Sequence, residues 1–332
     1  MLILNAETVR GMLDPLFDSG ALVEALAPAM ESLSRGEVSL PPRIAAMVEE
    51  RSAYLGTMPV YLKEPEILAA KIISVFPEND PEHHHTHYAS ILLFNPKSGE
   101  PIAMLDGSDI TAARTAAGSA LATRLLAREE AKTLTIIGNG VQARAHAKAL
   151  SRIRDLTRIQ IAGRDPAKAE QLALELDAEL AITVSSNSSI EHAVREADII
   201  CTTTHAAEPV LDWSWLKPGS HINSVGVNPQ GREIDAATVQ NARVFVEAIS
   251  SALAPPPGGA NELLWPIRDG LVNEDHICGE IGALSSGGID GRCDDTEVTL
   301  YKSVGVGVQD AVAADLVYRQ AIAKGLGITL EN

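Results

Sequence analysis

A glycine-rich turn between an apolar run and a helical pattern is the segment whose spacing points most directly to chemistry. Residues 133–150 read TLTIIGNGVQARAHAKAL, and Ala143 occupies the third position of a GxGxxG/A fingerprint. Glycine lets the backbone approach a pyrophosphate, and a helix N-terminus offers free N–H groups and partial positive charge. An ordinary strand–turn–helix connection is the alternative. In its βαβ context, the turn predicts a dinucleotide site at Gly138, Asn139, Gly140, Val141 and Gln142.

The end of the next expected strand bears on which dinucleotide would bind. NAD sites usually carry an acid there that takes the ribose hydroxyls. This sequence has Gly163 at that position, followed by Arg164, whose guanidinium suits a 2′-phosphate. Asp165 would restore an acid two residues later, or it begins the following helix at Asp-Pro. We expect NADPH to be preferred over NADH.

Three basic residues lie in apolar or Ala-rich surroundings. Arg43 lies in LPPRIAA, Lys71 in LAAKIIS and Arg114 in ITAARTAAG. Arg43 could be a surface charge after a Pro-Pro turn, and Arg114 a solvated residue on a helix. A solvated surface charge is a less suitable explanation for Lys71, because an unpaired ammonium between apolar neighbours is costly.

Four histidines fall within residues 82–90, EHHHTHYAS. In an extended chain His83, His85 and His87 would share one face, and imidazole is a common metal ligand. No carboxylate or cysteine partner is obvious in the sequence, so we expect no metal, although a metal-dependent enzyme remains an alternative. The stretch is internal and leads into a strand-like apolar run, which disfavours an affinity tag.

The elements that must position these residues follow from periodicity. A helix is expected at 21–33, strands at 67–76 and 88–95, and a hairpin from 88–95 through a Pro/Gly turn to 101–107. From 133 onward strands and helices alternate, with strands at 133–137, 158–162, 180–184, 221–225 and 242–246 and helices at 166–176 and 190–197. A last helix is expected at 304–324. Such alternation predicts an α/β fold with a parallel sheet covered on both faces.

Composition narrows the class of protein. A chain of 332 residues suggests two domains, and a net charge of −17 disfavours nucleic acid and anionic membrane as partners. Cys201, Cys278 and Cys293 form no CxxC motif, which fits a reducing compartment. We see no signal peptide and no bilayer-spanning run, so we expect a cytoplasmic location.

Several segments together resemble the ornithine cyclodeaminase/mu-crystallin family. They are RTAAGSA, IIGNGVQARAH, ADIICTTTHAAEPVL, LKPGSHINSVGV and VTLYKSVGVGVQDAVAA, while YLGTMP is most similar to the mu-crystallin branch. The resemblance implies a Rossmann-type NAD(P)-binding domain at 113–307, inserted into an α+β dimerisation and substrate domain. Both chain ends, 1–112 and 308–332, would form that second domain and pair with a second copy to make a homodimer.

The resemblance also implies roles for single residues. Arg43 and Arg114 would clamp the carboxylate of an α-imino or α-amino acid, while Lys71 would work near its nitrogen. His87 would lie near Lys71 and face the substrate, leaving His83, His84 and His85 as bystanders. The cofactor would be lined in addition by Thr202, Thr204, Val225, Gly226, Ser303, Val304 and Gly305.

One position departs from the family pattern. Where members that deaminate ornithine carry a catalytic aspartate, this chain has Asn228, and an amide cannot act as a carboxylate base. This disfavours ornithine cyclodeaminase and weakens alanine dehydrogenase. It leaves reduction of a cyclic ketimine, such as pyrroline-2-carboxylate or piperideine-2-carboxylate, or formation of an N-alkyl amino acid. Ligand binding without turnover is a further alternative.

Overall fold

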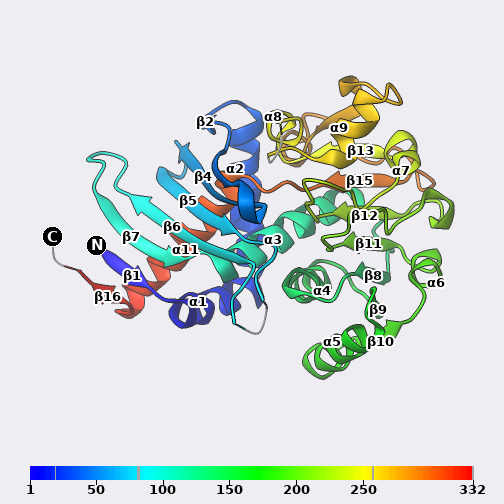
Figure 1. The fold of residues 1–332 in the computed structure, drawn as a ribbon, viewed down its shortest axis with the longest axis horizontal. Helices are drawn as coiled ribbons and strands as arrows, with labels where there is room; N and C mark the ends of the chain where they lie inside the picture. The colour runs from blue at the N-terminus through cyan, green and yellow to red at the C-terminus, as the bar shows by residue number, and fades with distance from the viewer. Residues whose placement is uncertain (19, 81–82, 256–257, 331–332) are drawn as a thin grey trace. The chain divides into compact units, whose positions relative to one another are not determined.

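The computed structural model describes residues 1–18, 20–80, 83–255 and 258–330 (Figure 1). The chain divides into two compact units. The end unit combines Met1–Arg114 with Gly305–Asn332, and the middle unit is Thr115–Val304. The boundaries between the two units lie at Arg114/Thr115 and Val304/Gly305.

The described part of the end unit contains one mixed sheet, with strand order β16-β1-β7-β6-β5-β4-β2 and β3 paired to β4. Its centre is the antiparallel series β4–β7, in which β6 and β7 form the predicted hairpin. The strands are β1 (Leu2–Leu4), β2 (Val38–Ser39), β3 (Ile44–Val48), β4 (Ala53–Leu62), β5 (Ile67–Val75), β6 (His87–Phe94), β7 (Pro101–Asp106) and β16 (Ile328–Thr329).

Helices cover one face of this sheet. The helix α11 (Gly307–Lys324) packs on β4, β5 and β6, and it also packs on α1 (Ala6–Asp18) and α2 (Ala21–Ser34). The covered face carries Met58, Lys71 and Ile91, which lie directly opposite one another on β4, β5 and β6. The reverse face carries Leu55, Tyr88 and Met104, all exposed. The sheet therefore buries a lysine on one side and exposes an apolar surface on the other.

The middle unit is built on a second sheet, and every pairing among its described strands is parallel. The strand order is β10-β9-β8-β11-β12-β15-β13-β14. The strands are β8 (Thr133–Ile137), β9 (Arg158–Ala162), β10 (Thr183–Asn187), β11 (Ile199–Thr202), β12 (His221–Ser224), β13 (Arg243–Val246), β14 (Ile277–Glu280) and β15 (Thr299–Lys302).

Helices connect these strands across both faces of the sheet. In Figure 1, α4 and α5 lie on one side of the sheet and α6 on the other. The order of β8, β9 and β10 beside β11 places a topological switch point between β8 and β11, where such folds bind ligands. The helices and 3-10 turns are α4 (Val141–Ile153), α5 (Pro166–Glu179), α6 (Ile190–Arg195), α7 (Ala236–Asn241), α8 (Ile249–Ala252), α9 (Asn261–Arg268), α10 (Ile281–Ser285), η2 (Trp213–Trp215) and η3 (Glu274–His276).

Two remaining elements complete the chain. The helix α3 (Ser108–Leu126) is continuous across the boundary between the units, and η1 (Glu49–Arg51) precedes β4. The fully buried strand positions of the middle unit, including Ile200, Ile222 and Leu300, form its hydrophobic core. No helix in the described ranges is both long and apolar enough to cross a membrane.

The predicted fold class, a Rossmann-type parallel sheet inserted into an α+β unit made by both chain ends, is confirmed. Some boundaries were wrong. The strand expected at 180–184 is Thr183–Asn187, because α5 continues to Glu179. The last helix begins at Gly307 rather than 304. The long strand β4 was not predicted, because glycine and proline interrupt its apolar pattern.

Candidate active site

Lys71 lies at the middle of β5, under α11, with only 2% of its surface exposed. Its ammonium Nζ donates to Thr111 Oγ1 at 2.7 Å and to Asp310 Oδ1 at 3.0 Å. The Thr111 hydroxyl itself donates to the Gly107 carbonyl, which leaves its lone pairs for the lysine. The Lys71 ammonium is thus bound by residues from the first turns of two helices, Thr111 of α3 and Asp310 of α11.

Arg114 joins the same carboxylate from α3, one turn after Thr111. Its Nε donates to Asp310 Oδ1 at 3.0 Å and its Nη1 to Gln309 Oε1 at 2.8 Å. The arginine is 5% exposed and Asp310 is 1% exposed. One buried carboxylate oxygen therefore accepts from two cations, while the other, Asp310 Oδ2, has no hydrogen-bond partner among the described residues.

Arg43 is half-buried and contacts the backbone that leads into α11. Its Nη2 donates to the Gly305 carbonyl at 2.9 Å. Gly305 has a φ of +71°, and a Cβ built on it would lie 2.6 Å from Nη1 of Arg114. Only glycine suits this position, since a side chain would be strained and would displace the guanidinium. Gly305, expected beside the cofactor, is placed by the structure between the two arginines of the end unit.

The cluster formed by Lys71, Arg114, Arg43 and Asp310 has three cations to one carboxylate. Burial lowers the pKa of Lys71 to about 8; the Asp310 carboxylate opposes this shift and the Arg114 charge adds to it. Burial alone would raise the pKa of Asp310, but the charges of Arg114 and Lys71 outweigh it and the pKa is lowered. Lys71 and Arg114 are both buried and share the single carboxylate of Asp310, so these three side chains carry one surplus positive charge in a buried site.

His87 does not lie where the sequence placed it. It pairs with Val75, whereas Ile91 is the residue opposite Lys71. Both histidine and lysine face the same side of the sheet, but four residues, or about 13 Å, separate them along the strand. The expected proximity of His87 to Lys71 is wrong, because the strand begins at His87 and Lys71 lies further along the ladder.

The other histidines form a turn rather than an extended strand. The backbone amides of His83 and His84 donate to the Asp80 carbonyl, and His83 Nδ1 lies 2.7 Å from Asp80 Oδ2. His83, His84 and His85 lie in a loop before β6, as expected, and not in the extended chain that would give His83, His85 and His87 a common face; Glu82 lies outside the described residues. Among the residues that the structure describes, no three His, Cys, Asp or Glu side chains gather to hold a metal ion.

The glycine turn of the middle unit joins β8 to α4. Gly138 has a φ of +131°, and a Cβ there would lie 2.5 Å from Thr203 Oγ1, so glycine is required. Nothing lies within 4 Å of a Cβ built on Gly140. No side chain caps the N-terminus of α4, and Val141 is exposed there. An open backbone cradle in front of uncapped amides fits an anionic pyrophosphate.

The end of β9 lies beside this turn. Asn139 Nδ2 donates to the Asp165 carbonyl at 3.3 Å and would be 3.3 Å from a Cβ on Gly163. The Asp165 carboxylate caps α5 by accepting from the amides of Ala167 and Lys168. Arg164 is exposed and makes no hydrogen bond or ion pair to a described residue. The aspartate is therefore engaged within its own helix, and the arginine is available.

The ends of β11 and β12 are joined by a carboxylate that the sequence did not single out. Glu233 accepts from the Thr202 hydroxyl at 2.9 Å, from the Thr204 amide at 2.5 Å and from the Gly226 amide at 2.6 Å. The neighbouring Val225 is buried and its amide donates to the Thr202 carbonyl. These predicted cofactor residues are brought together, and their polar groups are bound by one buried glutamate.

A second glutamate holds the end of β15. Glu247 accepts from Ser303 Oγ at 2.7 Å and from the Val304 amide at 2.9 Å. Lys302, at the last position of β15, is fully buried; its Nζ donates to the Gly226 carbonyl at 2.6 Å and lies 3.3 Å from Glu262 Oε2. The predicted segment 303–304 is thus anchored to the end of β13, where Glu247 follows Val246.

Asn228 is half-buried and stabilises its own loop. Its Nδ2 donates to the His205 carbonyl at 3.1 Å, and its Oδ1 accepts from the Gln230 amide at 2.9 Å. Both ends of the amide are used in backbone contacts, which is typical of an Asx turn. The structure places Asn228 near the end of β12 but gives it a structural role in the loop.

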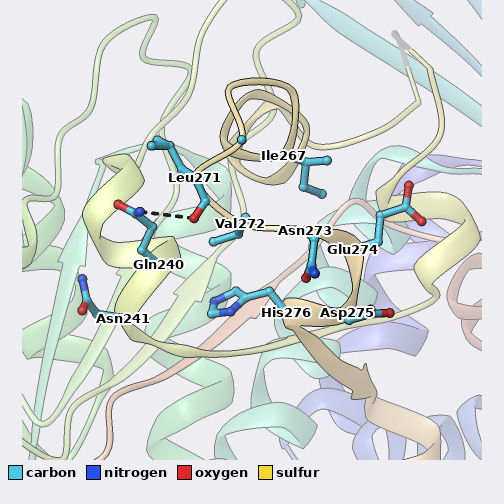
Figure 2. A pocket seen from close by; sticks show the side chains of 10 residues that line it. Gln240, Asn241, Ile267, Leu271, Val272, Asn273, Glu274, Asp275 and His276 are labelled. Atoms are coloured by element: carbon cyan, nitrogen blue, oxygen red, sulfur yellow. Dashed lines mark hydrogen bonds between the residues drawn. The ribbon is translucent and has the colours of Figure 1, made fainter.

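A surface pocket of about 1070 Å³ lies elsewhere in the middle unit (Figure 2). Its wall runs from the end of α7 and α9 to η3, so it lies where β13 and β14 begin. This is the amino edge of the parallel sheet, and ligands of such folds bind at the carboxyl edge. The lining residues are Gln240, Asn241, Ile267, Gly270, Leu271, Val272, Asn273, Glu274, Asp275 and His276. None of them is a predicted site residue.

Comparison with known proteins identifies the family. The model of the ornithine cyclodeaminase/mu-crystallin family matches residues 7–325. The chain belongs to the ornithine cyclodeaminase/mu-crystallin family. Among curated members, it is 34% identical over 319 residues to the ketimine reductase mu-crystallin of Mus musculus, covering 95% of this chain and 96% of that one. It is 33% identical over 333 residues to a Delta(1)-pyrroline-2-carboxylate reductase of Bacillus cereus, covering 100% of both chains.

Solved structures of family members share the whole architecture. The Delta(1)-pyrroline-2-carboxylate reductase of Thermococcus litoralis, in complex with NADH and L-proline, aligns with a TM-score of 0.93 at 34% identity over 99% of this chain and 100% of that chain. An archaeal alanine dehydrogenase dimer with bound NAD aligns with a TM-score of 0.90 at 27% identity, over 100% of this chain and 99% of that chain.

Sequence reasoning missed several residues of this family member's candidate site. Asp310 and Gln309 lie within VGVGVQDAVAA, one of the segments that carry the family resemblance, and Thr111 lies in ITAAR, three residues before Arg114. Glu233 and Glu247 gave no signal, because a single glutamate near an apolar run is usually a solvated side chain. Their burial, 1% and 0% exposed, is visible only in the folded chain.

Proposed function

We propose that this protein reduces a cyclic α-imino acid, such as Δ1-pyrroline-2-carboxylate or Δ1-piperideine-2-carboxylate, to the L-amino acid by hydride transfer from NAD(P)H. The observation that carries this proposal is the pair of buried cations, Lys71 and Arg114, that share the carboxylate of Asp310, with Arg43 half-buried beside them. Full-length similarity to ketimine and pyrroline-2-carboxylate reductases supports the same reaction.

The surplus positive charge suits the carboxylate of the substrate. A guanidinium can hold a carboxylate by two parallel hydrogen bonds, which fixes its orientation as well as its charge. Arg114 and Arg43 would supply this clamp, and the N-terminus of α11, which follows Gly305, adds partial positive charge. Gly305 would belong to the part of the site that binds the substrate carboxylate, because any other residue at this position would displace Arg114.

Lys71 would keep the substrate nitrogen protonated. A protonated imine carbon accepts hydride readily, so the protein must orient the reactants and hold that proton. With its pKa lowered to about 8, the Lys71 ammonium gives up a proton far more easily than an ordinary lysine. Thr111 and Asp310 hold its Nζ by two hydrogen bonds, which leaves the third N–H for the substrate.

The nicotinamide cofactor supplies the hydride when it is bound. The Gly138–Gly140 turn and the uncapped amides of α4 fit its pyrophosphate, as the open space above Gly140 indicates. The segments at Thr202–Thr204, Val225–Gly226 and Ser303–Val304 lie at the same carboxyl edge, where the nicotinamide end would lie. We assign no cofactor contact to Asn228, whose side chain is used within its loop.

We further propose that NADPH is preferred over NADH. Gly163 stands where an acid would take the ribose hydroxyls, the Asp165 carboxylate caps α5, and Arg164 is exposed beside them. The Thermococcus litoralis reductase was solved with NADH, so the cofactor preference of this protein is tested separately. Arg164→Ala should raise KM for NADPH about five-fold and leave KM for NADH unchanged, since exposed charge pairs are weak. Equal effects on both cofactors would refute the preference.

The end unit would serve as the dimerisation and substrate domain and the middle unit as the cofactor domain. The sheet face that carries Leu55, Tyr88 and Met104 lies opposite α11 and is apolar and exposed, as expected of a homodimer interface. The free cysteines Cys201, Cys278 and Cys293 fit a cytoplasmic location. Sedimentation or light scattering of the purified protein would test the dimer.

A substrate panel tests the function itself. Purified protein would be mixed with NADPH or NADH and with pyrroline-2-carboxylate, piperideine-2-carboxylate, or pyruvate plus methylamine, and the nicotinamide absorbance followed. We expect turnover of at least one cyclic imino acid. Pyruvate with ammonia would report an alanine dehydrogenase activity, and ornithine a cyclodeaminase activity. Tight cofactor binding with no turnover of any substrate would refute the reductase and favour a binding role.

A further inference from the structure

Two strands of the middle unit end on a single buried carboxylate. Glu233 is 1% exposed, and its Oε2 accepts both from the Thr202 hydroxyl at the end of β11 and from the Gly226 amide after β12. Its Oε1 accepts from the Thr204 amide. Hydrogen bonds to an ionised acceptor are the stronger kind, so this side chain joins the two strand ends firmly.

A second carboxylate does the same for the next pair of strands. Glu247 directly follows β13, is fully buried and accepts from the hydroxyl of Ser303 and the amide of Val304 after β15. The four strands β11, β12, β15 and β13 lie side by side in the sheet. Two glutamates therefore hold a continuous stretch of its carboxyl edge.

The backbone at Gly226 lies directly against the first carboxylate. A Cβ on Gly226 would lie 2.1 Å from the Thr204 carbonyl oxygen and 2.3 Å from Glu233 Cδ. There is no room between this backbone and the glutamate, so a displaced carboxylate would displace the strand end with it. The position of the edge is thus coupled to the position of the glutamate side chain.

We propose that Glu233 and Glu247 are positioning residues, which fix the backbone of Thr204, Gly226 and Val304 as the surface against which the nicotinamide end of the cofactor lies. This inference rests on the proposed function. Open parallel sheets bind ligands outside the carboxyl ends of their strands, and the two glutamates are buried at that edge and hydrogen-bonded to its backbone. They act through the backbone and do not touch the substrate.

The opposite edge of the same sheet offers a matched control. Asp198 lies just before β11. Its carboxylate accepts from the amide of Lys132, which precedes β8, and from the amide of Thr133, the first residue of β8, so it also joins two neighbouring strands. It forms ion pairs with Arg128 and Lys217. It is a clamp of the same chemistry at the amino edge, where no cofactor is expected.

The experiment compares Glu233→Gln with Asp198→Asn. The amide of glutamine keeps one acceptor oxygen and puts an NH2 group against the remaining donors. We expect Kd for NAD(P)H, measured by nicotinamide fluorescence, to rise about ten-fold and kcat to fall, because hydrogen bonds to a charged group are worth a factor of that order. In the protein alone, amide hydrogen exchange at Thr204 and Gly226 should accelerate. Asp198→Asn should lower Tm but leave Kd and kcat within about two-fold.

The inference is overturned if both variants lower Tm and neither changes Kd or kcat. Should Glu233→Gln fail to fold, Thr202→Val and Ser303→Ala each remove one donor and keep the carboxylates. Either should raise Kd by about three-fold, a typical value for one hydrogen bond, and unchanged values for both overturn the inference. Wild-type protein that binds no NAD(P)H would instead refute the proposed function, together with this inference.

Discussion

The two units of the molecule each bury a triad of charged side chains, and the two triads have opposite composition. In the end unit, Lys71 and Arg114 share Asp310. In the middle unit, Glu233 and Glu262 lie around Lys302, which pairs with Glu262 at 3.3 Å. One triad has a surplus cation and the other a surplus anion, and a buried charge without compensation is expensive.

The difference lies in what compensates the surplus. The extra negative charge of the middle unit is compensated by the chain itself, since Glu233 accepts from the amides of Thr204 and Gly226. The extra positive charge of the end unit has no second carboxylate among its described partners. The triad of the middle unit, whose surplus charge is compensated by backbone amides, is suited to holding the backbone in place. The triad of the end unit, whose surplus charge is not compensated in this way, is suited to binding a ligand of opposite charge.

The directions of the pKa shifts agree with this contrast. Burial lowers the pKa of Lys71 to about 8, and burial raises the pKa of Glu233 against the opposing effect of Lys302. In both cases burial favours the neutral form of the side chain, the amine of Lys71 and the carboxylic acid of Glu233.

The largest expected effect comes from removing the cation that would act on the substrate nitrogen. Lys71→Met keeps the volume and the apolar stem but loses the ammonium. We expect kcat/KM for the cyclic imino acid to fall about 1000-fold, as for loss of a general acid. Kd for NAD(P)H serves as the control and should not change. A loss of less than ten-fold would remove Lys71 from the chemistry.

Removing the single cation of the other triad should act on stability instead. Lys302→Met leaves Glu233 and Glu262 buried without their ammonium, which costs about 3–5 kcal/mol. Thermal or urea unfolding measures this loss. KM for the imino acid should remain unchanged below the lowered Tm, and a specific rise in that KM with no loss of stability would contradict the contrast between the triads.

Arg114 tests whether the surplus positive charge binds a carboxylate. Arg114→Ala should raise KM for the imino acid about 10- to 100-fold, the value of a charged hydrogen-bonded pair. Arg114→Lys keeps the charge without the planar fork, so it should recover only part of the affinity. An unchanged KM in both variants would exclude Arg114 from the carboxylate clamp.

The pH dependence gives the smallest effect and the most direct test of Lys71. Below pH 8 the lysine is an ammonium, and as pH rises through about 8 it loses its proton, so kcat/KM should fall by about ten-fold per pH unit above that value. Stability has the opposite sign. Unfolded Lys71 keeps its proton up to about pH 10.4, so its contribution to the free energy of unfolding rises between the two values. A flat profile from pH 7 to 10 would refute the assignment.

Periodicity predicted β8, β9, β10, β12 and β13 of the middle unit, because parallel strands buried on both faces appear as uninterrupted apolar runs, but it did not predict β14 and β15. It missed β4, whose Gly56 and Pro59 break the pattern, and it placed β10 three residues early. Lys71 was detectable as a charge in an apolar strand. His87 was misplaced relative to Lys71, since only the register of β5 and β6 shows which residues lie opposite one another.

The sequence by itself determined the glycine turn, the class of fold, the family and the three cations, since each depends on local spacing or on a residue type in an unusual setting. Only the tertiary structure decided how those cations are compensated. Asp310 lies 239 residues from Lys71 in the chain, and Glu233 joins strand ends through contacts spanning up to 31 residues. Burial and charge balance are properties of such long-range contacts, and no local pattern encodes them.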